Sequence, residues 1–122
     1  MKLAMIQGDT KAFTFTLYED DETTPLDLEG NPSGDAPVVT FTARKYQHST
    51  DIVKVSDDGI ELGAEDGEII VTIDPADTDE IDVPDYLARL TLLWDIQVES
   101  DGETHTRRRG ELVLYPQVTE PA

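Results

Sequence analysis

The longest alternating segment of this chain, YLARLTLLWDIQV at residues 86–98, constrains its fold more than any other feature. Every even position is apolar, and the odd positions are mixed: Tyr86, Ala88, Leu90, Leu92, Trp94, Ile96 and Val98 against Leu87, Arg89, Thr91, Leu93, Asp95 and Gln97. Side chains alternate between two faces along a β-strand, whereas a helix would spread these residues round its circumference. The pattern therefore predicts a long strand with one buried face.

The residues that follow predict a hairpin. ESDGET (99–104) contains Asp101-Gly102, a pair that readily takes the positive φ angles of a tight turn. The return strand is expected over about residues 104–115, with Leu112 and Leu114 on one face. Together the two strands form the longest element of the predicted fold.

Shorter segments upstream carry the same signal. Apolar residues alternate with Thr and other β-formers at residues 12–18, 38–45, 51–55 and 68–73, and turn-forming residues separate these segments. DPADTDEIDVPD (74–85) differs, because Asp74 suits an N-cap, Pro75 the first helical position and Pro84 a stop. A single helical turn is expected there.

These elements predict an all-β fold. About seven strands with frequent turns and one short helical turn are typical of an immunoglobulin-like antiparallel β-sandwich, and a small β-barrel is the alternative. The helical turn before Tyr86 resembles the tyrosine corner of such sandwiches. We expect one domain over residues 1–122, with a long acidic loop at 19–37.

The net charge of the chain limits its partners. It has 27 acidic and 9 basic residues, a formal net charge of −18, and no cysteine. Such a field repels phosphate backbones and anionic lipids, and no segment approaches the ~20 apolar residues of a membrane span, so we expect neither nucleic acid nor membrane as a partner. Dense carboxylates with only four lysines favour a halophilic source over an ordinary acidic domain.

No group of residues points to catalysis or to a cofactor. Asp95 is the one carboxylate inside the longest strand, and its odd position places it on the outward face, opposite a basic neighbour on the adjacent strand. No partner residue supports an active-site role for it. His48 and His105 do not have the spacing of metal ligands, and the acidic runs 19–22, 56–59 and 74–79 lack the register of a calcium loop. We therefore expect no enzyme activity, no cofactor, no metal and no small-molecule substrate.

The run Arg107-Arg108-Arg109 is the exception in this acidic chain. On a regular strand Arg107 and Arg109 share one face, and Arg108 lies on the inner side with its stem on apolar surface. The pair could match carboxylates across the hairpin, or it could bind an acidic partner surface. We predict that Arg107 and Arg109 contact a partner subunit.

The order of landmarks along the chain resembles a family of small structural proteins of tailed viruses. Their immunoglobulin-like domain is similar to the N-terminal domain of phage baseplate upper proteins. The matching segments are IQGDTKAFTFTLYED (6–20), PLDLEG (25–30), VTFTARK (39–45), DGIEL (58–62), GEIIVTIDPADTD (67–79), Tyr86 through WDIQV (94–98) and GELVLYPQVT (110–119). The resemblance implies a β-sandwich that forms part of a virion and performs no catalysis.

The resemblance and the acidic composition together give the expected function. The chain is expected to be a virion protein of a tailed virus with a halophilic archaeal host, and to form part of the head–tail region, the tail, the baseplate or a capsid accessory part. Its expected partners are other virion proteins and copies of itself. The alternative is a cellular acidic binding or adhesion module of the same fold, for which calcium would be the expected ion.

Overall fold

The alternating segments form strands as predicted, and two further strands join them. The computed structural model describes residues 2–19, 21–26, 28, 37–45, 52–56, 58–78, 81, 89–100 and 102–116, and within these residues it has eight strands and one helical turn. In chain order they are β1 (Lys2–Ile6), β2 (Lys11–Thr16), β3 (Val38–Arg44), β4 (Ile52–Ser56), β5 (Gly59–Leu62), β6 (Glu68–Ile73), α1 (Pro75–Thr78), β7 (Leu90–Ser100) and β8 (Glu103–Tyr115). The six segments that were predicted as strands correspond to the others, and β1 and β5 were not among them.

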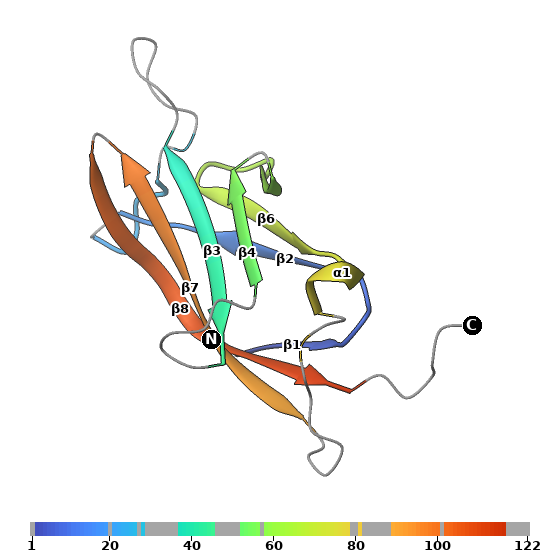
Figure 1. Ribbon diagram of the computed structural model, residues 1–122. Helices are drawn as coiled ribbons and strands as arrows, with labels where there is room; N and C mark the ends of the chain where they lie inside the picture. The colour runs from blue at the N-terminus through green and yellow to red at the C-terminus, as the bar shows by residue number, and fades with distance from the viewer. Residues whose placement is uncertain are drawn as a thin grey trace.

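The strands form a single sheet in the order β1-β8-β7-β3-β4-β5-β6-β2. Only two residue pairs join β4 to β5: Val55 with Gly59, and Ser56 with Ile60. At this narrow link the sheet folds over, so that β1, β8, β7, β3 and β4 form one layer and β5, β6 and β2 form the other. Figure 1 shows β2 and β6 behind β3 and β4.

The strand order within each layer is that of an immunoglobulin-like sandwich. If β2 to β8 are taken as strands B, C, C′, D, E, F and G, the layers have the orders G-F-C-C′ and D-E-B. The all-β prediction is confirmed, but the sheet is mixed and not purely antiparallel, because β1 pairs with β8 and β4 with β5 in parallel. The sheet is also continuous and nearly closed into a barrel, so the structure combines both predicted architectures.

The core lies between the two layers and is filled by the predicted faces of the strands. On β7 the buried residues are Leu92, Trp94, Ile96 and Val98, which are the even positions of the alternating segment. The Trp94 ring lies between two aromatic rings of other strands, with centroids 5.1 Å from Phe15 and 5.7 Å from Phe41. These contacts join β7 to both β2 and β3, and so fix the two layers against each other.

The helical turn α1 begins at Pro75, as predicted after Asp74. The other predicted features of this region and of the loops lie outside the described residues: Pro84, Tyr86, Asp101, His48 and most of the acidic loop at 19–37. Among the residues that the structure describes, no helix has the length and apolar character needed to cross a membrane.

Candidate functional site

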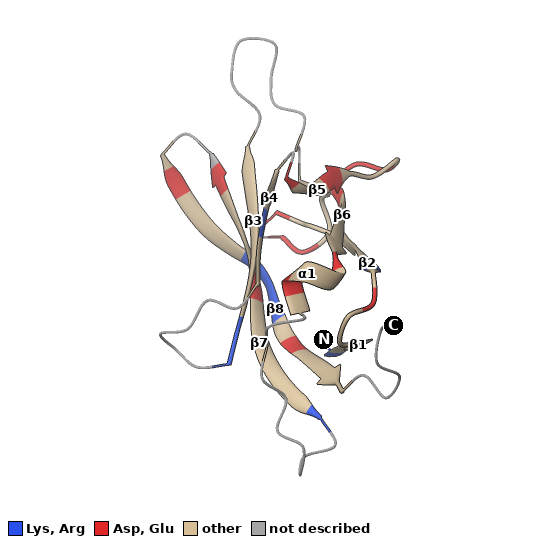
Figure 2. Ribbon diagram, turned by 45° about the vertical axis from the view of Figure 1, so that its right-hand side comes forward, with Lys and Arg blue, Asp and Glu red and all other residues tan. Residues whose placement is uncertain are grey.

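The arginine run lies in the middle of β8, away from the hairpin tip (Figure 2). A β-bulge interrupts the pairing of β8 with β7 there. Ile96 pairs with Arg108, but the next residue, Gln97, pairs with Thr106, so Arg107 is the extra residue of the bulge. Because a bulge inserts one residue, it breaks the regular alternation of side chains on the two faces.

The bulge overturns the prediction that Arg107 and Arg109 share a face. Arg107 and Arg108 together line a surface hollow with Tyr18, Glu19 and Glu22. Arg107 also lines a neighbouring hollow with Glu19, Asp21 and Leu26, and its Nε atom is buried. Arg109 instead pairs in register with Asp95 on the outer face. That Arg107 or Arg109 binds a partner subunit stays a prediction. Because the two side chains lie on different faces of the sheet, they cannot both contact a partner that covers one face.

Arg108 lies on the inner side, as predicted. It is in register with the fully buried Ile96, and its guanidinium reaches across to the other layer. There it donates a hydrogen bond of 3.3 Å to the carbonyl oxygen of Thr16, at the end of β2. Since β8 is the second strand of the sheet and β2 is the last, this bond connects strands that lie near opposite ends of the strand order.

The outer face of β3, β7 and β8 carries an exposed leucine surrounded by charge. Leu93 is 61% exposed, the largest value among the large apolar side chains of the described residues. It lines an open hollow together with the side chains of Thr42, Arg44, Asp95, Arg109 and Glu111. We call these six residues the Leu93 patch. An exposed leucine with a polar rim is the composition of a small protein-binding surface.

The Leu93 patch differs in charge from the rest of the molecule. Its two arginines balance its two carboxylates, whereas the whole chain carries −18. In the part of the chain that the structure describes, the ion pairs are Lys54–Asp74, Lys54–Asp77 and His105–Glu103, so Asp95, Arg109 and Glu111 belong to none. Asp95 thus lies opposite a basic neighbour on the adjacent strand, as predicted, but it does not form an ion pair with Arg109.

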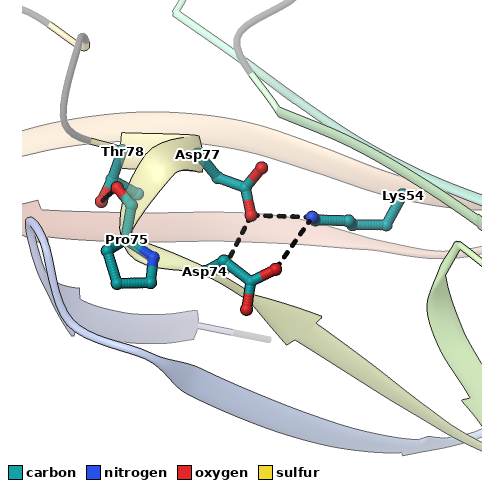
Figure 3. Close-up of polar contacts among 5 residues, drawn as sticks. All are labelled: Lys54, Asp74, Pro75, Asp77 and Thr78. Carbon is teal, nitrogen blue, oxygen red and sulfur yellow. Dashed lines mark hydrogen bonds and ion pairs between the residues drawn. The ribbon is translucent and has the colours of Figure 1, made fainter.

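A second polar cluster lies at the end of the core, where β4 meets α1 (Figure 3). Lys54 is 9% exposed, and its Nζ lies 2.8 Å from Asp77 Oδ2 and 3.8 Å from Asp74 Oδ2. Asp77 Oδ2 also accepts a 2.7 Å hydrogen bond from the backbone N–H of Asp74, which closes the helical turn. The lysine therefore joins β4 to the segment that leaves β6.

The same helical turn also binds the corner between β1 and β2. Gln7 Nε2 donates to the carbonyl oxygens of Thr78 at 2.9 Å and Ile81 at 2.7 Å. The backbone N–H of Gly8 donates to Thr78 Oγ1 at 2.8 Å. Thr78 is fully buried, so its polar atoms depend on these partners. We interpret α1 as a structural junction and the Lys54 cluster as part of it.

The Lys54 cluster was not predicted from the sequence, although the sequence contains a signal for it. Ile52 and Lys54 share one face of a short strand, so the alternation that buries Ile52 also places Lys54 inside. A buried lysine requires an anionic partner, and the acidic run at 74–79 was one of the groups that could supply it. Which of its carboxylates meets the lysine depends on the path of the chain from β4 to α1.

The acidic runs do not assemble into a metal site within the described residues, where no group of three or more Asp, Glu, His or Cys side chains converges. Asp21 has a local role instead. Its carboxylate accepts hydrogen bonds from the Thr24 hydroxyl and from the backbone N–H groups of Thr24 and Thr23. These bonds, that of the hydroxyl first, lower the pKa of Asp21 from 3.8 to about 2.

Compared with protein-family models and with curated proteins, the sequence matches none of them. Among the surface features described above, the Leu93 patch combines exposure, apolar area and balanced charge on strands that the core holds in place.

Proposed function

We propose that this protein is a structural component of the particle of a tailed virus with a halophilic archaeal host, and that it acts by binding neighbouring proteins and not by catalysis. The observation that carries the proposal is the Leu93 patch on the outer face of β3, β7 and β8. The ordered resemblance to small virion proteins supports the same assignment. Within the particle it belongs to the head–tail region, the tail, the baseplate or a capsid accessory part.

The Leu93 patch suits assembly for a physical reason. Protein interfaces have an apolar centre that loses its water and a polar rim that remains partly hydrated. A molecule with a charge of −18 repels acidic neighbours over most of its surface. At the patch the arginines cancel this repulsion, so another acidic protein of the same particle can approach Leu93 there.

The location is tested on particles purified from the culture that produces them. Mass spectrometry of gradient-purified particles should find this protein in fixed proportion to the main capsid protein, and immunogold labelling should place it at one part of the particle. Recovery of the protein only in the cell-envelope fraction would contradict the proposal and favour the cellular adhesion module.

The role of the patch is tested by complementing a virus that lacks the gene. Leu93→Asp should abolish incorporation into particles, because it places a charge in the apolar centre of the interface. Leu62→Asp is the matched control, since Leu62 is 48% exposed and lies on β5 in the other layer. Equal incorporation of the two variants would show that the patch has no part in assembly.

A further inference from the structure

Three side chains of the Leu93 patch form a straight row across three neighbouring strands. Arg44 on β3 is in register with Leu93 on β7, and Leu93 is in register with Glu111 on β8. Neighbouring strands lie about 4.8 Å apart, so a cation and a carboxylate flank the leucine at similar distances on opposite sides. All three line the same hollow, so they share the outer face.

The row Arg44–Leu93–Glu111 has a symmetry consequence. A two-fold axis along β7, passing over Leu93, exchanges the β3 side of the face with the β8 side. A second copy placed by this axis would set Arg44 opposite Glu111 of the partner subunit, and the reverse contact would form at the same time. The two Leu93 side chains would meet on the axis. The row is thus complementary to itself, as a two-fold interface requires.

The neighbouring row has a related arrangement. Thr42, Asp95 and Arg109 are in register on β3, β7 and β8. The same axis brings Asp95 near Asp95 of the partner subunit, and each carboxylate lies beside its own Arg109. The arginine therefore supplies the positive charge that two facing carboxylates need. This gives Arg109, but not Arg107, the contact role that the sequence suggested.

The charge of this face favours a second acidic copy as the occupant. The two arginines of the Leu93 patch balance its two carboxylates, in a chain whose total charge is −18. The net charge of the chain opposes the approach of a second copy. A contact that covers the patch removes apolar area from water, and the one pair of like charges that it brings together, the two Asp95 carboxylates, has an Arg109 beside each carboxylate.

We infer that the chain forms a face-to-face homodimer through the Leu93 patch, with Leu93 at the two-fold axis and Arg44 paired to Glu111 of the partner subunit. The inference rests on the proposed function, because it names a second copy as one of the partners of the assembly surface. It adds the residues that pair and the symmetry that relates them.

The pairing is tested by charge reversal in the full chain, at the lowest KCl concentration at which circular dichroism shows it folded. Arg44→Glu and Glu111→Arg each place like charges together twice per dimer, so analytical ultracentrifugation should show a rise in Kd of roughly tenfold or more. An equimolar mixture of the two variants should recover the wild-type Kd, because each reversed side chain then meets an opposite charge. The double variant should recover it as well.

Two control variants carry the same charge changes away from the patch. Arg89→Glu and Glu61→Arg alter exposed residues outside it and should leave Kd unchanged. A wild-type protein that stays monomeric at high concentration, or a mixture that fails to recover dimerisation, overturns the inference. A monomer whose Leu93→Asp variant is excluded from particles would show that a different virion protein occupies the patch. A dimer that is absent from particles would instead contradict the proposed function alone.

Discussion

At the scale of single residues, the buried and half-buried cations of this acidic chain hold segments together. Lys54 joins β4 to α1, and Arg108 joins β8 to the end of β2. Both have apolar stems that fit an inner position and a charged head that reaches a polar group at the edge of the core. Arg109, one residue further along, lies on the outer face and joins no two segments among the described residues.

The contrast between Arg108 and Arg109 predicts different effects on stability. Arg108→Met keeps most of the stem but removes the hydrogen bond to Thr16, and should lower the free energy of unfolding by about 1 kcal/mol. Arg109→Met makes the same chemical change on the exposed face and should alter the free energy of unfolding by less than about 0.5 kcal/mol. Urea denaturation of the monomer measures both values. Equal losses in the two variants would refute the bridging role of Arg108.

Asp21 gives a prediction about pH. Its hydrogen bonds hold the folded pKa at about 2, below the ordinary value of 3.8. Because the folded pKa is the lower one, the bonds stabilise the fold above pH 3.8, and this contribution is lost as pH falls through 3.8 towards 2. Thr24→Val removes the hydroxyl donor and should move the pKa of Asp21 upwards. Carboxyl chemical shifts in an NMR titration report the midpoint, and an unchanged midpoint in the variant would exclude the hydroxyl as the main cause.

At the scale of elements, α1 is short but connects three parts of the sheet. It receives Lys54 from β4, the polar groups of Gln7 and Gly8 from the corner after β1, and the chain that leaves β6. A helix of four residues has little stability of its own, so these contacts must hold it in place. Loss of one contact should therefore weaken the junction without unfolding the sheet.

Lys54→Met tests the junction. The variant keeps an apolar stem but leaves Asp77, which is 22% exposed, without its cation, so the free energy of unfolding should fall by about 1.5–3 kcal/mol. Lys2→Met removes the same charge from an exposed position and serves as the control in the same chemical denaturation series. A Lys54→Met variant as stable as this control would show that packing alone holds α1 against β4.

The β5–β6 hairpin depends on Gly67, which has a φ of 74°. A Cβ at this position would lie 2.6 Å from the carbonyl oxygen of Leu17 and 3.0 Å from the backbone nitrogen of Leu26. Those two atoms form one hydrogen bond, from Leu26 N–H to Leu17 O, and the N–H of Leu17 donates to Gly67 O, so the added Cβ would lie where the end of β2 and the following turn are attached. The glycine thus permits close contact between two hairpins.

Comparison of Gly67→Ala with Gly102→Ala separates this contact from backbone strain. Gly102 in the β7–β8 turn has a φ of 81° but no atom near an added Cβ, so its substitution should cost only about 1 kcal/mol of conformational strain. Gly67→Ala adds a collision with backbone and should cost roughly 2–4 kcal/mol. Thermal unfolding of both variants measures the difference in lost stability. Equal losses would mean that the two hairpins move apart to accommodate the added methyl group at no cost in free energy.

At the scale of the whole molecule, the net charge of −18 acts on the fold as a uniform repulsion. Screening shortens the range of this repulsion to about 3 Å at 1 M salt. The isolated protein should therefore melt at a higher temperature in molar KCl than in dilute buffer, as measured by circular dichroism. A melting temperature that is flat or falls across the salt series would contradict a halophilic origin.

The sequence by itself determined which residues form strands and which faces they bury. That information is local, because side chains two apart on a strand share a face, and the predicted inner faces of the described strands are buried. The class of fold followed from it. The outward position of Leu93 and Asp95 was part of the same pattern, and so was the inner position of Arg108.

The tertiary structure decided the features that depend on partners distant in the sequence. The short strands β1 and β5 form because other strands supply their partners: β8 pairs with β1 in parallel, and β5 pairs with both β6 and β4. The bulge at Arg107 moves one side chain between faces, and the row Arg44–Leu93–Glu111 arises from the register of three strands. A one-residue change in register inverts the faces beyond it, and no local pattern reports that change, so the shape of the candidate site became visible only in the folded sheet.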